Sequence, residues 1–140
     1  MLVILQFISR LFYLAFGSNR LRPYERVCID AWRSTLTNEL RQKLDKQLEK
    51  FDFVQRQARR TKSVFYCIRD PDYKTWGDDE LFPNREEDRR VFTGTLTGEI
   101  GDITESVRFG VYLHRGRLSS IEFESEPGAL ASISTGLAVR

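Results

Sequence analysis

The chain has 140 residues, of which 41% are hydrophobic and 12% aromatic, and its formal net charge is +2. This length and composition fit one globular domain with its own core, residues 1–140, and exclude an intrinsically disordered chain. The charge is unevenly divided, because residues 1–69 hold 14 Lys and Arg against 6 Asp and Glu, whereas residues 70–140 hold 8 against 14. A basic half and an acidic half can attract each other within the fold or present two separate surfaces.

Residues 1–17 are the most apolar part of the chain and are predicted to form a helix. Four polar residues recur at helical spacing and make one narrow stripe, namely Gln6, Ser9, Arg10 and Tyr13. The run is shorter than the roughly 20 apolar residues of a membrane-spanning helix, and no basic residue precedes it as in a signal peptide. We expect this helix to pack on the protein's own core. A surface for a partner or a second copy, and a membrane contact through residues 2–16, remain alternatives, of which the membrane contact is not favoured.

Residues 23–60 are predicted to be helical with one break. Pro23 suits the first turn of a helix, and Thr37 can cap a second helix that follows the break. Apolar residues in this second helix form a stripe at helical spacing, namely Leu40, Leu44, Leu48, Phe51 and Val54, so we expect it to run to about Arg59. The basic residues near its end, Arg56, Arg59, Arg60 and Lys62, complement the helix dipole, and no nucleic-acid partner is expected.

Residues 62–125 are predicted to form a four-stranded antiparallel sheet. Its strands are expected at 62–69, 91–100, 107–113 and 118–124. Gly116 can take the positive φ that a tight turn needs, and a bulge is expected near Ser119 and Ser120. Six residues from the helix and the last two strands are expected to be buried together, namely Leu44, Leu48, Phe51, Phe109, Val111 and Phe123.

The predicted fold class is therefore α+β, with two or three N-terminal helices packed on a four-stranded antiparallel β-meander. Residues 127–140 are rich in Gly and Ser, so a loosely ordered tail is expected. Cystatin-like and cone-shaped folds share this order of elements, but a shared architecture assigns no function.

Residue types that carry catalysis are sparse in this chain. His114 is the only histidine, and it lies at a predicted hairpin turn, where a desolvated general base is not expected. The sequence has no zinc-ligand spacing and no nucleotide-binding or nucleophile motif, so we expect no enzyme activity, no cofactor and no metal. Cys28 and Cys67 are expected to be buried thiols, which agrees with a cytoplasmic location.

The connection over residues 70–90 is long and combines carboxylates with aromatic side chains. Its acids do not match the spacing of a calcium loop. A solvated acidic face would explain the acids alone, whereas a contact surface for a protein partner explains both residue types, because aromatics supply affinity and charges steer encounter. The predicted partner-binding residues are Asp70, Asp72, Tyr73, Trp76, Asp78, Asp79, Glu80 and Phe82.

Several short segments carry a resemblance to other proteins: Pro23-Tyr24-Glu25-Arg26, Ala31-Trp32-Arg33, Gln47-Leu48, Phe51-Asp52, Val54-Gln55-Arg56, Leu81-Phe82-Pro83 and the run Gly116 to Phe123. Together they resemble small single-domain bacterial proteins of uncharacterised or immunity type, which accompany secreted toxins, over roughly residues 20–125. The resemblance implies a cytoplasmic bacterial protein that acts by binding, and whose partner is a toxin domain with an active surface to be occluded.

Two other functions compete with this interpretation. A small cone-like ligand carrier or enzyme would need an internal pocket with convergent polar groups, for which Tyr66, Arg108 and Tyr112 are candidates. An oligomeric module would instead use the apolar N-terminal helix as its contact.

Overall fold

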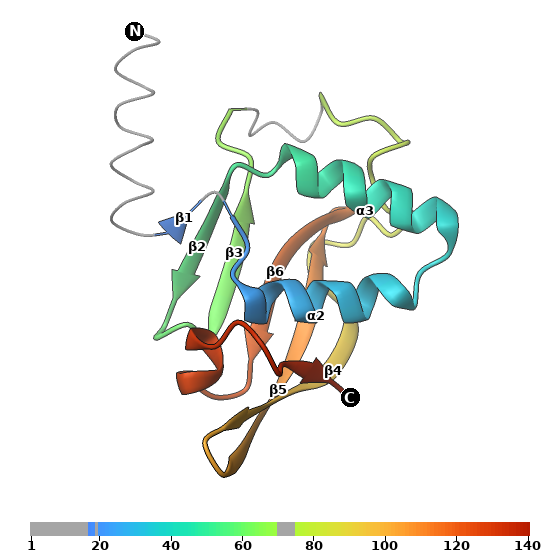
Figure 1. The fold of residues 1–140 in the computed structure, drawn as a ribbon. Coiled ribbons are helices and arrows are strands. Elements are labelled where there is room, and N and C mark those ends of the chain that lie inside the picture. Colours follow the sequence, from blue (N-terminus) through green and yellow to red (C-terminus); the bar gives the residue numbers. More distant parts are fainter. Residues whose placement is uncertain (1–16, 19, 70–74) are drawn as a thin grey trace, which may run out of the picture.

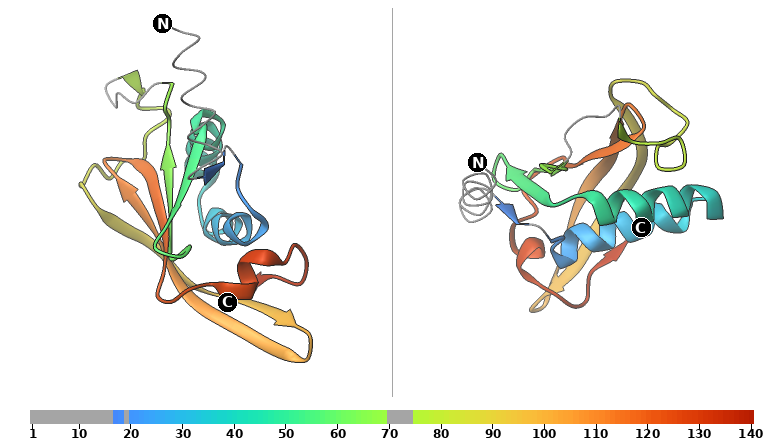
Figure 2. Two further views of the ribbon diagram at one scale, coloured as in Figure 1. Left: turned by 90° about the vertical axis from the view of Figure 1, so that its left-hand side faces the viewer. Right: turned by 90° about the horizontal axis from the view of Figure 1, so that it is seen from above.

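The computed structural model describes residues 17, 18, 20–69 and 75–140. They form an α+β fold in which two α-helices, α2 (Pro23–Ser34) and α3 (Asn38–Lys50), lie on one face of an antiparallel sheet (Figures 1 and 2). The apolar helix predicted over residues 1–17 lies outside the described residues, except for Gly17, which begins the first strand. None of the helices within the described ranges is long and apolar enough to cross a membrane.

The sheet is larger than predicted and is not a simple meander. Its seven strands are β1 (Gly17–Ser18), β2 (Phe53–Gln57), β3 (Lys62–Tyr66), β4 (Arg89–Ile100), β5 (Ile103–His114), β6 (Arg117–Phe123) and β7 (Ala138–Val139). Their spatial order is β1-β2-β3-β6-β5-β4-β7, so β6 lies between β3 and β5. The four predicted strands are all present, and β2 with the two short edge strands completes the sheet.

The prediction that the second helix continues to Arg59 is wrong. Helix α3 ends at Lys50, and the chain turns into β2, which pairs over five residues with β3. The apolar residues Phe51 and Val54 fit a helical stripe, but the ladder with β3 decides the conformation because it satisfies the backbone of both strands. Arg59 and Arg60 therefore lie in the β2–β3 turn, where both have positive φ, and not at a helix C-terminus.

The hairpin of β5 and β6 forms as predicted. Arg115 (φ 51°) and Gly116 (φ 83°) make its two-residue turn, the geometry whose twist matches that of the flanking strands. The register passes from Tyr112↔Ser120 to Leu113↔Leu118, which leaves Ser119 as the extra residue of the expected bulge.

The predicted core is confirmed with one exception. Leu44, Phe51, Phe109, Val111 and Phe123 all belong to one buried cluster between the helices and the sheet. Leu48 packs against this cluster but is only partly buried.

The predicted loose tail is instead ordered. A 3-10 helix (Gly128–Ser132) buries Leu130, and the backbone of Arg140 exchanges two hydrogen bonds with Thr95 next to β7. Gly98 allows this close approach, because a Cβ there would lie 2.7 Å from Leu130 Cδ2. Packing against β4 therefore orders residues 128–140, whose sequence has only a weak intrinsic preference for helix or strand.

A buried ion pair fastens α2 to the sheet. The Glu25 carboxylate is fully buried, pairs with Arg56 of β2 (2.5 Å) and accepts a hydrogen bond from the Ser63 hydroxyl of β3 (2.5 Å). Burial, with a further contribution from the Glu25 charge, raises the pKa of the nearby Cys28 thiol. Cys28 and Cys67 are both buried, as predicted, and are not joined to each other.

We expect truncation of Leu44 to cost roughly 2–5 kcal/mol of unfolding free energy, because this side chain is fully buried. Leu48→Ala should cost less than about half as much, since part of that side chain is already in water. Chemical denaturation of the two variants measures the difference. An equal or larger loss for Leu48→Ala would show that the wrong face of α3 has been assigned to the core.

Candidate functional site

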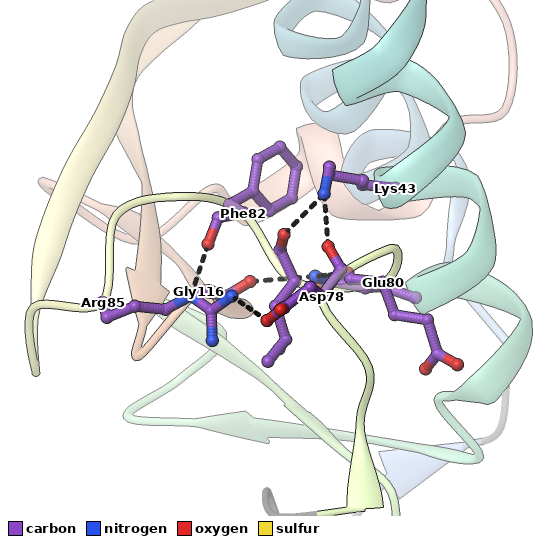
Figure 3. Close-up of polar contacts among 8 residues, drawn as sticks. Lys43, Asp78, Glu80, Phe82, Arg85 and Gly116 are labelled. Carbon is purple, nitrogen blue, oxygen red and sulfur yellow. Dashed lines mark hydrogen bonds and ion pairs between the residues drawn. The ribbon is translucent and has the colours of Figure 1, made fainter.

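The described part of the acidic connection, residues 75–88, is held between α3 and the β5–β6 turn (Figure 3). Strands β3 and β6 pair only at Lys62–Val64, so the sheet has no ladder between the end of β3 and the start of β6. Trp76 lies at this opening, with its ring centroid 5.9 Å from that of Phe51 and the Arg117 guanidinium 4.9 Å from its centroid. The loop thereby covers the place where the two strands diverge.

Gln47 of α3 joins the loop to the hairpin. Its fully buried side-chain amide donates to the carbonyls of Glu80 (2.7 Å) and Gly116 (2.9 Å), and its oxygen accepts from the Leu118 amide (2.8 Å). Three of the hydrogen bonds that a glutamine can form are thus used on two segments far apart in the sequence. The loop and the hairpin turn consequently have fixed positions relative to α3.

Three lysines on one side of α3 bind the loop, one through backbone carbonyls and two through carboxylates. Lys43 Nζ donates to the backbone carbonyls of Asp78 and Leu81. Lys46 pairs with Asp79 (3.0 Å), and Lys50 pairs with Glu80. The hydrogen bond and charge of Lys46 hold the pKa of Asp79 below its ordinary value, so this carboxylate remains ionised at neutral pH.

The far side of the loop is fastened to the hairpin turn. Phe82 donates its backbone N–H to the Gly116 carbonyl (2.9 Å), and Arg115 N–H donates to the Glu86 carbonyl (2.8 Å). A Cβ on Gly116 would lie 2.7 Å from the Phe82 carbonyl oxygen, so glycine is needed here for contact as well as for its positive φ. Arg85 closes the loop on itself by binding the Phe82 carbonyl and the Asp78 carboxylate (Figure 3).

The predicted partner-binding residues divide into three groups. Asp70, Asp72 and Tyr73 lie outside the described residues. Trp76 and Phe82 are each only 4% exposed, and Phe82 stacks near Trp32 of α2, so in this structure they are core residues. Asp78 and Asp79 lie on the surface, with the Asp78 side chain 98% exposed. Glu80 is partly buried against Lys50.

This arrangement corrects the role given to Trp76 and Phe82. Both were expected to anchor a contact with a partner, but both instead anchor the loop to its own protein. The physical reason is the sheet opening below the loop, which leaves apolar side chains of α2, α3 and β3 to be covered.

Gln47, Lys43 and Gly116 were not predicted to contribute to this site. The signal available in the sequence was the excess of basic residues in the first half and of acidic residues in the second. That asymmetry is compatible with electrostatic attraction between the two halves of the chain. The ion pairs between lysines of α3 and acidic residues of the loop are an attraction of this kind.

The residues suggested for an internal pocket have other neighbours. Arg108 pairs with Glu124, and the Tyr66 hydroxyl lies 3.4 Å from Gln55. A different hollow of about 330 Å³ lies where the start of α2, α3 and the β2–β3 hairpin meet, lined by Arg20, Leu21, Arg26, Leu48, Phe51, Val54 and Phe65. Among the described residues, no group of three or more His, Cys, Asp or Glu is arranged to hold a metal ion.

Comparison with protein-family models, with curated proteins and with solved structures found no match to this chain.

Gln47→Ala should lower the unfolding free energy by about 1–3 kcal/mol, because it leaves the buried Leu118 N–H without its acceptor and removes the amide donor from the Glu80 carbonyl. Amide hydrogen exchange should also accelerate selectively in residues 75–82. The matched control is Gln42→Ala on the exposed side of the same helix, which should change stability by less than about 0.5 kcal/mol. Equal effects of the two substitutions would contradict a special role for Gln47.

Proposed function

We propose that this protein is a non-enzymatic binding protein of the bacterial immunity type, which acts in the cytoplasm by occluding the active surface of a toxin. The contact surface in this proposal is the acidic ridge, formed by the exposed carboxylates of Asp78, Asp79, Glu86, Glu87 and Asp88. The observation that carries the proposal is that buried contacts hold the loop bearing this ridge in one conformation.

A fixed loop suits a binding protein for an energetic reason. Ordering a flexible loop on association consumes part of the interaction energy, and a preorganised loop avoids that cost. Here Trp76, Leu81 and Phe82 are buried, and Gln47 fixes the backbone between them. The carboxylates therefore approach a partner from defined positions without a folding step.

The charges of the ridge suit a basic partner surface. Asp78, Asp79 and Glu87 already form ion pairs with Arg85, Lys46 and Arg115, yet all three carboxylates remain largely exposed. Exposed pairs of this kind contribute little to stability, so a partner's Arg or Lys can add to them or replace the internal cation. Such charges act mainly on the rate of association.

The test uses the protein encoded next to this one as the candidate toxin, with association and dissociation followed by surface plasmon resonance. Asp78→Asn combined with Asp79→Asn should slow association, and the difference from the parent should shrink as salt rises. The matched control combines Asp30→Asn with Glu39→Gln, which removes two exposed carboxylates from α2 and α3. If the ridge variant and the control both bind within about twofold of the parent, the ridge is not the interface.

The apolar hollow favours a second candidate function, the binding of a small ligand. Leu48, Phe51 and Phe65 supply apolar walls, while Arg20 and Arg26 lie at the same hollow, a combination suited to an apolar molecule with an anionic group. A native mass spectrum of protein purified from its own cells should then show a bound mass that Leu48→Trp, which fills the hollow, removes. A spectrum of the bare chain from both proteins would contradict this function.

A further inference from the structure

Strands β4 and β5 continue beyond all their neighbours as a two-stranded arm, residues 98–106. On one side β7 pairs with β4 only at Leu96 and Thr97, and on the other side the last β5–β6 pair is Phe109↔Phe123. Within the arm, β4 and β5 pair only with each other, up to the turn at Gly101 and Asp102. Figure 2 shows this hairpin projecting from the body of the protein.

The arm has an open strand edge on its β5 side. The Arg108 carbonyl accepts a hydrogen bond from the Glu124 amide (2.9 Å), so Arg108 directs its backbone toward β6. Alternate residues of a strand direct their backbone groups to the same side, which places the N–H and C=O of Ser106 and Thr104 along the continuation of the β6 line. In the part of the chain that the structure describes, no strand follows β6 there. An open edge of this kind is a template for an added strand.

The side chains of the arm restrict which strand could be added. Ile103 is 65% exposed, more than any other large hydrophobic residue described. Glu99, Asp102 and Glu105 are exposed, and within the described ranges no cation pairs with them. Because residues 98–106 contain no Lys or Arg, a second copy of the arm would be repelled, whereas a strand carrying basic residues would be attracted.

We propose that the arm binds an extended basic segment of another protein as an added strand along the β5 edge at Thr104 and Ser106. Main-chain hydrogen bonds to these two residues provide the binding, an apolar side chain of the added strand covers Ile103, and Lys or Arg lies beside Glu105. This surface is separate in sequence from the acidic ridge, and the inference stands whether or not that ridge binds a toxin.

The test uses a fluorescent synthetic peptide with the repeat Val-Thr-Lys-Thr, which places Val and Lys on the same face of an extended strand, as Ile103 and Glu105 are on β5. Anisotropy is the readout. A second peptide of the same sequence is N-methylated at alternate residues, which keeps the charge and removes the N–H groups of one edge. The unmodified peptide should bind the parent about tenfold more tightly than the N-methylated peptide, because strand addition depends on those N–H groups. Amide hydrogen exchange in the parent should slow at Thr104 and Ser106 when the unmodified peptide is added.

Two variants distinguish the contribution of backbone hydrogen bonds at the β5 edge from that of the carboxylates of the arm. Thr104→Pro removes an N–H that faces away from β4, and it should weaken binding about tenfold while the circular dichroism spectrum is retained. Replacing Glu99, Asp102 and Glu105 by their amides should weaken peptide binding and reduce its dependence on salt. The matched control combines Glu122→Gln with Glu124→Gln, which removes carboxylates from β6 and just beyond it, and it should leave peptide binding unchanged. The ridge variant Asp78→Asn with Asp79→Asn should bind the peptide like the parent.

The proposal would be overturned by equal binding of the two peptides, which indicates charge attraction without strand addition. Absence of binding at about millimolar peptide, where even weak strand addition is detected, would also overturn it. So would unchanged exchange at Thr104 and Ser106 in the parent, a result that does not depend on whether any variant folds.

Discussion

The buried amide of Gln47 is the interaction on which the rest of this structure depends. It is the contact through which α3 binds both the loop at Glu80 and the hairpin at Gly116 and Leu118. The neighbouring lysine contacts depend on this interaction, because Lys43 and Lys50 reach the loop only when the loop lies against α3. A buried amide is stabilising only when its donors and acceptor are paired, so one residue ties the conformation of three segments together.

Charge is used differently at the two ends of the molecule. Near α3, acidic residues of the loop are balanced by lysines of the helix, and the remaining exposure of Asp78 and Asp79 gives a fixed but largely compensated surface. On the β4–β5 arm, Glu99, Asp102 and Glu105 have no cation among residues 98–106. Some of the acidic residues in the second half of the chain thus form ion pairs within the fold, whereas others lie on the arm beside the unpaired edge of β5. The two proposed binding surfaces differ in this respect.

Much of the local structure was predictable from the sequence. Alternation in residues 107–113, the glycine at Gly116 and the out-of-phase Leu118 predicted the β5–β6 hairpin with its bulge, because strand period and turn geometry are local properties. The Pro23 start and the Thr37 cap of the helices were predictable for the same reason. The end of α3 was not, since Phe51 and Val54 suit a helix or a strand and only pairing with β3 distinguishes the two.

The sequence by itself determined the fold class, the antiparallel hairpin and the membership of most of the core, because these depend on spacing between residues that are neighbours along the chain. Only the tertiary structure decided that Trp76 and Phe82 face inward, because the space they fill arises where β3 and β6 diverge. It also decided that residues 128–140 are ordered, through contacts with β4 that no local preference encodes. In each case the deciding contact joins residues distant in sequence, whose proximity is a property of the whole sheet.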